Sequence, residues 1–600
     1  GATGQGGGYR NVYNKTATML YNLQYVLGDS LFTAAMKHYF NQWSFRHPYI
    51  EDFRNSIIEF TKVDLNWFFD EWIETSKVID YKIYPLKALD SGKFLLKLKR
   101  KADMQMPLDI SIVGESGKRY NFYVPNTWFE KKTEATTLPR WIGWDNKLKT
   151  EYQAKISLPE RPKYATIDTT ERLADINELN NTTKFPWKFK FDSKTGRPLD
   201  RQNYTVLWRP DIWYNNYDGI KVGAHFEGSL NRFYHNTSLD VWANTGVGKW
   251  ALRDKNYYTN PSGDQHDIAS IRFSYQTPTN LFIRNSSIKL EARHLDGTML
   301  GLFKFTKYVN ENLSLSISNK YFQRYRDAQQ YYDYLPNYQL GYSNYGNNSL
   351  ILDASYNKAP NAEFRHSTNF RLRTSLFTIK EYSYAELEHK QEIRLSKITY
   401  RWRGYGRVGV NASSYSEVAL NAGGGSVEDM LENEFMRAVS IPTKGYTTPN
   451  NTFNQLHYKG GLNMRGYAFR DYIYNNNTLS NQQISNQNTG ISFNSQLNFE
   501  KLSPIKFRKL AQTFELNTYL FGDIGSIGNH TASGFKFDMS PWLYDAGMGA
   551  SLTMKKFGFL SGIKPLTFRF DMPCYLSHPA GNENNENLRF RWLLGVDHAF

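Results

Sequence analysis

The feature that most constrains the fold is a period of two in the hydrophobicity of the C-terminal part of the chain. Apolar and polar side chains alternate through Leu588–Phe600, Phe514–Asp523 and Ile491–Glu500. Period two indicates β-strands with one apolar and one polar face. The polar faces carry charges and amides that suit the interior of a closed barrel. Strands of roughly ten residues, apolar outside and polar inside, are what an outer-membrane β-barrel requires.

Composition agrees with a membrane barrel. Aromatic residues make up 16% of the chain, led by 42 Tyr and 39 Phe, although the mean hydropathy is −0.61. No run of eighteen apolar residues is present, so the sequence offers no transmembrane helix. Abundant aromatic residues without apolar runs are typical of barrels with aromatic girdles. A length of 600 residues exceeds what one soluble core supports, so we expect more than one domain.

The charge balance narrows the class of partner. The formal net charge is +16, but Lys and Arg are dispersed and no nucleic-acid recognition motif accompanies them, so we expect no nucleic-acid partner. Anionic lipid or acidic peptide is the expected partner of the positive charge. The single cysteine, Cys574, excludes a disulfide framework.

Two short motifs lie among the C-terminal strands. Gly460–Tyr467 contains Arg465-Gly466-Tyr467, and Phe521-Gly-Asp523 follows on a later strand. A guanidinium and a carboxylate inside a barrel form a charge-assisted, bidentate contact that can fix a long loop in the lumen. We therefore assign Arg465 and Asp523 structural or gating roles and no catalytic role.

These motifs resemble the paired motifs of the Omp85 outer-membrane protein superfamily, in which an Arg-Gly-Phe/Tyr loop folds into the lumen and meets Phe-x-Asp on the thirteenth of sixteen strands. Five strand-like segments follow Tyr467, and an aromatic residue, Phe600, ends the chain, as the resemblance requires. The resemblance implies a site of Arg465, Gly466, Tyr467, Phe521 and Asp523, with Phe600 as the C-terminal signal read by the barrel-assembly machinery. An unrelated barrel of similar size is the alternative. The five segments are Ile491–Glu500, Phe514–Asp523, Leu543–Met554, Leu566–Met572 and Leu588–Phe600.

Residues 12–79 have a helical pattern. Apolar residues recur at spacings of three and four, Gly28 supplies a helix stop, and Asp29 or Ser30 caps the next helix. Val12–Leu20, with Tyr13 and Lys15, and the later Asp64–Trp72 resemble the end of the catalytic domain of M1 zinc metallopeptidases, the gluzincin aminopeptidases. Further matching stretches are Leu27–Phe32 and His47–Phe53.

The resemblance implies that Tyr13 is catalytic. In the family a Tyr-x-Lys-Gly motif supplies the tyrosine whose hydroxyl stabilises the tetrahedral oxyanion, and here Thr16 replaces the glycine. A phenol donor aimed at developing negative charge lowers the barrier to the reaction. The alternative is a tyrosine that packs on its neighbours at the start of a helix.

The family's zinc motif, His-Glu-x-x-His, is not found in the sequence. His38 and His47 are nine residues apart, a spacing that does not match a metal-ligand motif, so we predict no metal-binding residue in these 600 residues. We expect zinc in a full-length parent, with its ligands encoded before Gly1. The chain is then the C-terminal part of a longer precursor.

The remaining segments complete a mixed, mainly all-β architecture: a short helical segment, a small β-sandwich and an antiparallel outer-membrane barrel of about 16 strands. We place the domain boundaries at 1–80, 81–176 and 177–600. Residues 175–183 are expected to be a polar linker with one helical turn, and the barrel pattern begins at Phe185, with roughly ten strands before Gly460. Predicted strands include Trp187–Phe191, Leu207–Val222, Ser287–Ala292, Leu313–Ile317, Leu350–Ser355, Asn369–Thr374 and Ile398–Arg403, with Arg401 and Arg403 facing the lumen; predicted outward loops are Asp327–Asn348, Ala422–Met430 and Tyr472–Thr489.

Two functions remain open. The first is a metallopeptidase anchored in the outer membrane of a Gram-negative bacterium, with the N-terminal domains in the periplasm and peptide as substrate. The second is an Omp85-type translocation or membrane-insertion protein with a non-catalytic peptidase-like module. A purely structural anchor is a third reading. Residues encoded before Gly1 discriminate between the first two, because an intact His-Glu-x-x-His favours the enzyme.

Overall fold

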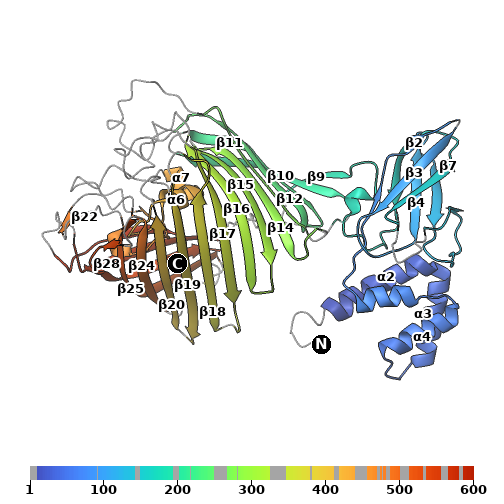
Figure 1. Ribbon diagram of the computed structural model, residues 1–600, viewed down its shortest axis with the longest axis horizontal. Coiled ribbons are helices and arrows are strands. Elements are labelled where there is room, and N and C mark those ends of the chain that lie inside the picture. The colour runs from blue at the N-terminus through green and yellow to red at the C-terminus, as the bar shows by residue number, and fades with distance from the viewer. Residues whose placement is uncertain are drawn as a thin grey trace. The chain divides into compact units, whose positions relative to one another are not determined.

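The computed structural model describes most of the chain (Figure 1). The described residues are 10–90, 92–141, 149–192, 200, 202–215, 218–248, 267–279, 282–296, 298–324, 346–361, 363–378, 381–396, 398–410, 418–439, 456–468, 473–475, 478–480, 487–499, 513–531, 536–555, 565–579 and 586–600.

The chain divides into two compact units. The first comprises residues 1–189, 199–206 and 230–232, and the second comprises 190–198, 207–229 and 233–600. The first unit thus runs past the boundary at 177 that the sequence predicted for the start of the barrel domain.

The first unit begins with helices. Gly28, at φ +80°, ends α2 and stands immediately before α3. The predicted helix stop at Gly28 is confirmed, but the predicted side-chain cap is wrong. Only one residue separates the two helices, so Gly28 is itself the N-cap and no side chain caps α3. The helical elements are η1 (Arg10–Lys15), α2 (Thr16–Leu27), α3 (Asp29–Trp43), α4 (Ile50–Thr61), α5 (Asn66–Phe69) and η2 (Asp70–Glu74).

A β-sandwich follows, as predicted. One four-stranded sheet has the order β1-β3-β2 with β7 also paired to β3, and the other has the order β6-β5-β4-β8. Strand β3 shows the alternation that a sandwich requires, because Phe94, Leu96 and Leu98 are buried and the residues between them are less buried. The strands are β1 (Tyr81–Ile83), β2 (Lys87–Ala88), β3 (Lys93–Arg100), β4 (Leu108–Gly114), β5 (Arg119–Val124), β6 (Thr136–Thr137), β7 (Glu151–Ser157) and β8 (Pro162–Ile167).

The helical turn predicted within residues 175–183 is present, but the prediction of a linker is wrong, because these residues pack on the sandwich. Asp175 is buried, and its carboxylate accepts hydrogen bonds from the backbone N–H of Tyr81 and of Asn177, each at 2.8 Å. Asn180, in η3 (Glu178–Asn180), donates to Asp80 at 2.8 Å. Polar residues here satisfy buried groups, which sequence polarity alone cannot distinguish from solvation.

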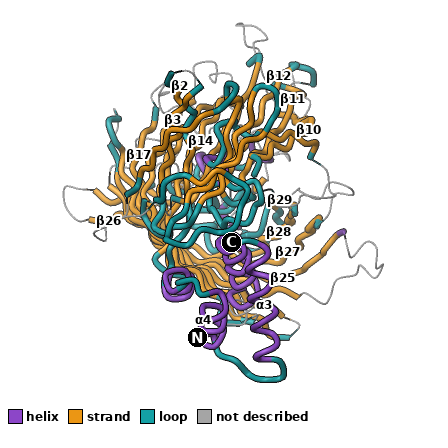
Figure 2. The backbone as a smooth tube through the Cα atoms, turned by 90° about the vertical axis from the view of Figure 1, so that its right-hand side faces the viewer, coloured by secondary structure: helices purple, strands orange, loops and turns teal. Residues whose placement is uncertain are grey.

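The second unit is built on one large sheet, antiparallel except where β21 pairs with β29 in parallel, and its strands lie side by side in a curved array in Figures 1 and 2. Its strands are β9 (Trp187–Phe191), β10 (Tyr204–Asn215), β11 (Gly219–Leu230), β12 (Tyr234–Asn244), β13 (Ala269–Pro278), β14 (Ser286–Leu295), β15 (Thr298–Tyr308), β16 (Leu313–Arg324), β17 (Asn347–Lys358), β18 (Phe364–Ser375), β19 (Ser383–Leu395), β20 (Ile398–Val410), β21 (Leu456–His457), β24 (Thr489–Phe499), β25 (Phe514–Thr531), β26 (Lys536–Met539), β27 (Leu543–Met554), β28 (Leu566–Leu576) and β29 (Leu593–Val596).

Strand order follows the chain as a meander from β9 to β20, and then through β24, β25, β27 and β28 to β29. The strand order is that of a barrel, in which β29 and β9 are neighbours. Thirteen strands of this sheet, β9–β21, precede Gly460 among the described residues, so the prediction of roughly ten was too low. The predicted strand 207–222 holds parts of two strands, β10 and β11. Strand β20 also pairs directly with β24, with Ile398 opposite Phe499.

The two faces of the sheet differ as the alternation predicted. On β18, Phe370 and Leu372 are each 40% exposed, whereas Arg373 is 6% exposed. Arg403 on β20 is likewise buried, so its inward placement is confirmed. The outward face is therefore apolar and suited to lipid, and the inward face is polar. No helix in the described parts of the chain has the length and hydropathy needed to cross a bilayer.

Three predictions near the loops need correction or fall outside the described residues. The predicted outward loop Ala422–Met430 is wrong: residues 422–426 are buried, and α6 (Val427–Glu432) and α7 (Glu434–Val439) follow. Most of Asp327–Asn348 lies outside the described residues, as does much of Tyr472–Thr489, where β22 (Ile473–Asn475) pairs with β23 (Thr478–Ser480). The predicted strand Leu588–Phe600 shortens to β29.

Candidate functional site

Tyr13 lies in the helical part of the first unit. It belongs to η1, the π-helical turn that leads into α2, and its side chain is 63% exposed. The local sequence explains the position, because the buried residues of α2 start only at Met19. The accessible ring is consistent with a hydroxyl that could meet a ligand, and its catalytic role stays a prediction.

No metal centre is present among the described residues, where no group of three His, Cys, Asp or Glu side chains lies close enough to hold an ion. His38 stacks on Phe60 with ring centroids 4.7 Å apart, which agrees with a packing role. The described residues therefore do not fit a zinc site.

The Arg465 loop folds inward, as the sequence predicted. Residues Arg465–Tyr467 form a short 3-10 turn, and all three are buried. Arg465 and Asp523 make a bidentate ion pair: Nε donates to one carboxylate oxygen at 2.9 Å and Nη2 to the other at 3.0 Å. Both side chains have 0% exposure. The expected contact is thus present and fully desolvated. A buried ion pair is strong only where its polar atoms have hydrogen-bond partners, and nearly every polar atom of this pair has one.

Additional partners complete the environment of the Arg465 guanidinium. Nη1 donates to the side-chain oxygen of Gln496 at 3.0 Å, and Nη2 also donates to the backbone carbonyl of Ser495 at 3.3 Å. Its carbon lies 3.8 Å from the ring centroid of Phe521. Phe521 therefore serves as a face for the cation, two residues before the carboxylate on the same inward side of β25.

Gly466 and Tyr467 each have a separate structural role in the loop. A Cβ on Gly466 would lie 2.6 Å from Cβ of Asp545 on β27, so only glycine allows the loop to approach the wall this closely. The Tyr467 hydroxyl accepts from the backbone N–H of His578 at 3.1 Å and lies 3.0 Å from the Ser577 hydroxyl. The tyrosine thus anchors the loop to the end of β28.

The end of the chain lies against the same loop. The Asn463 side chain donates to the backbone carbonyl of Ala599 at 3.0 Å, and the guanidinium carbon of Arg465 lies 5.9 Å from the ring centroid of Phe600. Asp597, at φ +65°, immediately follows β29. These contacts add a structural partner for Phe600; its assembly-signal role stays a prediction.

Sequence reasoning missed several residues of this site. Asn494 donates to Asp523 at 3.2 Å and to the backbone carbonyls of Leu462 and Asn463, and Asp545 stands directly opposite Asp523 in the strand register. The inward parity of Asn494 was visible in the sequence. Its partner was not, because register between strands decides which inward side chains meet.

Comparison with known families supports the expected M1-like region directly. Residues 9–72 match the Peptidase family M1 domain. The M1 resemblance is thereby confirmed for the helical part of the first unit, and the second unit supplies the large β-sheet of the fusion that the sequence predicted. No curated protein matches the chain.

Several solved structures are similar to the chain at low identity. BamA from Haemophilus ducreyi lacking POTRA domains 1–3 is 12% identical, with 95% of this chain and 98% of that chain covered and a TM-score of 0.33. OprD from Pseudomonas aeruginosa is 9% identical over 63% of this chain and 79% of its own, with a TM-score of 0.29. Legionella pneumophila aminopeptidase A is 16% identical over 26% of this chain, which spans 16% of that protein, with a TM-score of 0.18.

Proposed function

We propose that this chain is part of an outer-membrane-anchored M1-type zinc metallopeptidase that removes N-terminal residues from peptides. The observation that carries the proposal is the match of residues 9–72 to the M1 domain in the same chain as a large sheet with an apolar outer face. The sheet is the lipid-embedded anchor in the outer membrane of a Gram-negative bacterium, and the helical and sandwich domains lie in the periplasm.

In this proposal Tyr13 donates its hydroxyl to the oxyanion that forms during peptide hydrolysis. Its 63% exposure supports a position that substrate can reach. The metal, which would polarise the scissile carbonyl when bound, has no ligand set among the described residues, and the sequence has no His-Glu-x-x-His. No step is therefore assigned to the metal through this chain.

The test uses the protein together with the residues encoded before Gly1, extracted from membranes in detergent. We expect stoichiometric zinc, hydrolysis of aminoacyl anilides and loss of both on chelation. The 600-residue chain alone is expected to bind no stoichiometric zinc and to hydrolyse none of these substrates. An extended protein that binds no zinc and releases no amino acid would refute the enzyme.

The Arg465 loop favours the second candidate, an Omp85-type translocation or membrane-insertion protein. The loop is folded inward and its motif is paired with Asp523, features that the resemblance to that superfamily implies. In this case the M1-like region recognises a polypeptide without cleaving it. Intact binding of peptide by an extended protein without hydrolysis, together with a defect in outer-membrane protein assembly on its depletion, would favour this candidate.

A further inference from the structure

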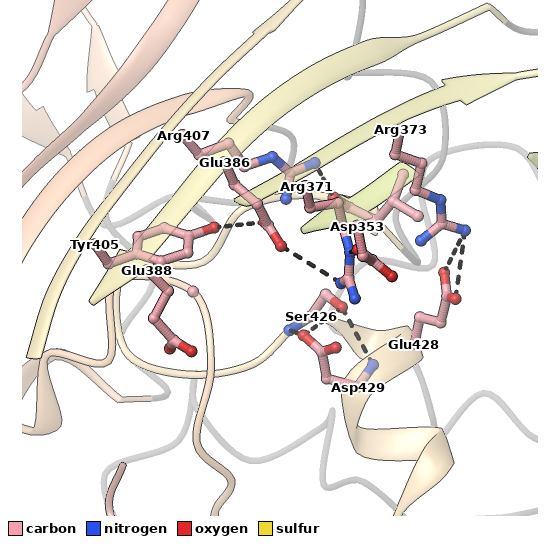
Figure 3. Close-up of polar contacts among 12 residues, drawn as sticks. Asp353, Arg371, Arg373, Glu386, Glu388, Tyr405, Arg407, Ser426, Glu428 and Asp429 are labelled. Atoms are coloured by element: carbon pink, nitrogen blue, oxygen red, sulfur yellow. Dashed lines mark hydrogen bonds and ion pairs between the residues drawn. The ribbon is translucent and has the colours of Figure 1, made fainter. Parts of the chain in front are cut away.

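A segment of residues 418–439, here called the acidic segment, lies against the inward wall of the barrel sheet. It includes α6 and α7, and its three glutamates Glu428, Glu432 and Glu434 all pair with wall cations. Figure 3 shows Glu428 on α6 pointing to Arg373 of β18. The segment also contacts strands near both ends of the sheet, because the Phe435 ring meets those of Trp213 on β10 and Phe568 on β28.

Four cations of the wall hold the acidic segment. Glu428 accepts from Arg373 at 3.0 Å and from Lys320 at 2.5 Å. The remaining pairs are Glu432 with Lys320 at 2.9 Å and with Arg293 at 3.1 Å, and Glu434 with Arg272.

The pattern of pairing shows that these cations are set apart from other charges of the wall. Arg371 pairs with wall carboxylates, Asp353 at 2.7 Å and Glu386 at 3.4 Å. By contrast, within the described residues all ion pairs of Arg293, Lys320 and Arg373 go to the acidic segment. The wall is thus electrically incomplete at this position without an acidic chain against it.

The strand register also places two of these cations opposite each other. Arg272 on β13 stands directly opposite Arg293 on β14, and like charges at directly opposed positions destabilise a sheet. Asp240 offsets part of the charge of Arg272, at 2.8 Å. Glu432 and Glu434 supply the rest, so the sheet carries a repulsive pair whose relief depends on carboxylates from another segment.

Exposure is graded along the interface. The side chains of Glu428 and Arg373 are 5% and 6% exposed, whereas those of Glu434 and Arg272 are 47% and 31% exposed. Water therefore reaches one end of the interface, and a competing carboxylate chain could displace Glu434 first and Glu428 last. Screening by salt acts on the exposed end more than on the buried end.

We propose that Arg272, Arg293, Lys320 and Arg373 form a binding site for an acidic polypeptide segment, and that residues 418–439 occupy this site as an internal competitor. The recognition chemistry is carboxylate against a row of guanidinium and ammonium groups, which is fulfilled equally by any extended or helical chain with glutamate or aspartate at matching spacing. When residues 418–439 occupy the site, the apparent affinity for an external peptide is the intrinsic affinity multiplied by the fraction of the protein in which the site is free.

The test measures binding of a labelled ten-glutamate peptide to the detergent-purified protein, with a ten-lysine peptide as the probe of opposite charge. Glu428→Gln, Glu432→Gln and Glu434→Gln combined should tighten ten-glutamate binding by roughly tenfold or more, because the competitor loses its charge while the wall keeps its own. Adding Arg293→Gln and Arg373→Gln should remove the gain, and raising salt should weaken binding.

The matched control is Asp353→Asn, which removes a wall carboxylate that the acidic segment does not use; it should leave ten-glutamate affinity within about twofold. Heat-modifiable mobility on gels verifies that each variant is assembled. If the triple variant does not assemble, Glu434→Gln alone, at the half-exposed end, should still tighten binding. The proposal is overturned if the assembled variants bind ten-glutamate no better than the wild type, or if ten-lysine binds as well.

Discussion

The sharpest test of the lumenal site is removal of the Asp523 carboxylate. In Asp523→Ala, Arg465 loses its bidentate partner while its side chain keeps 0% exposure. Among the described residues, Arg465 would retain only Gln496 and the Ser495 carbonyl as acceptors. Breaking a buried pair by removing one partner costs about 3–5 kcal/mol, which is a factor of roughly 10² to 10⁴ in the ratio of folded to unfolded protein.

The reverse change, Arg465→Ala, should cost a similar or smaller amount. Asp523 would keep the hydrogen bond from Asn494 at 3.2 Å and that from the backbone N–H of residue 465 at 3.1 Å. The double variant leaves neither charge stranded, so its cost should fall short of the sum of the two single costs by about 2 kcal/mol or more.

The assay is the urea midpoint of heat-modifiable mobility, measured for the wild type, both single variants and the double variant. Asp538→Ala, at an exposed position on β26, is the matched control and should change stability by no more than about 0.5 kcal/mol. Costs that add fully in the double variant would refute the reasoning, because they would show that Arg465 and Asp523 do not act as one pair.

Other predictions concern single positions. The protein should be recovered in outer-membrane detergent extracts with a heat-modifiable band, and recovery in soluble form without detergent would contradict the barrel. With the residues before Gly1 present, Tyr13→Phe should lower turnover by ~10² or more with zinc content unchanged, whereas Tyr21→Phe, 60% exposed on α2, should not; equal turnover of both variants would end the role of Tyr13. Gly466→Ala should cost about 1–3 kcal/mol by overpacking against the wall, while Gly406→Ala on β20, whose Cβ would meet nothing within 4 Å, should be near neutral by the same urea assay. Burial raises the pKa of Asp80 to about 6, and the Asn180 hydrogen bond opposes the shift. Because this pKa lies above the unfolded value of about 3.9, the protonated Asp80 contributes up to ~3 kcal/mol of stability below about pH 4, and this contribution is lost as the pH rises through about 6. Asp80→Asn should therefore flatten the pH dependence of the first unit's calorimetric melting temperature.

Much of the fold could be predicted because it depends on local patterns. Alternation placed β24, β27 and β28 within a few residues and gave the start of β25, since each strand has one apolar and one polar face, but it ended β25 at Asp523 whereas the strand runs to Thr531. The two-residue β21 and the shortened β29 were not predictable. Alternation continues through Leu588, which is 76% exposed, but the pattern does not show where ladder pairing stops.

The lumenal site was predictable only in part, for a different reason. Arg465 and Asp523 could be paired because both occur in recognisable short motifs. Ala422–Met430 was expected to point outward because glycines and polar residues are typical of exposed loops. In the structure those glycines permit close backbone contact instead: the Gly425 N–H donates to the Tyr458 carbonyl at 3.0 Å, and a Cβ on Gly425 would lie 2.7 Å from the Lys459 carbonyl oxygen.

The same contacts join the acidic segment to the Arg465 loop. The backbone N–H groups of Leu462 and Met464 donate to the carbonyls of Asn421 and Ala422 at 3.1 and 2.9 Å. One end of this assembly is held by the buried pair of Arg465 and Asp523 and the other by the glutamates of α6 and α7. Because the buried pair has 0% exposure and the outer glutamate pair is half exposed, the glutamate end opens at lower cost, and opening there frees cations of the wall without releasing the Arg465 loop.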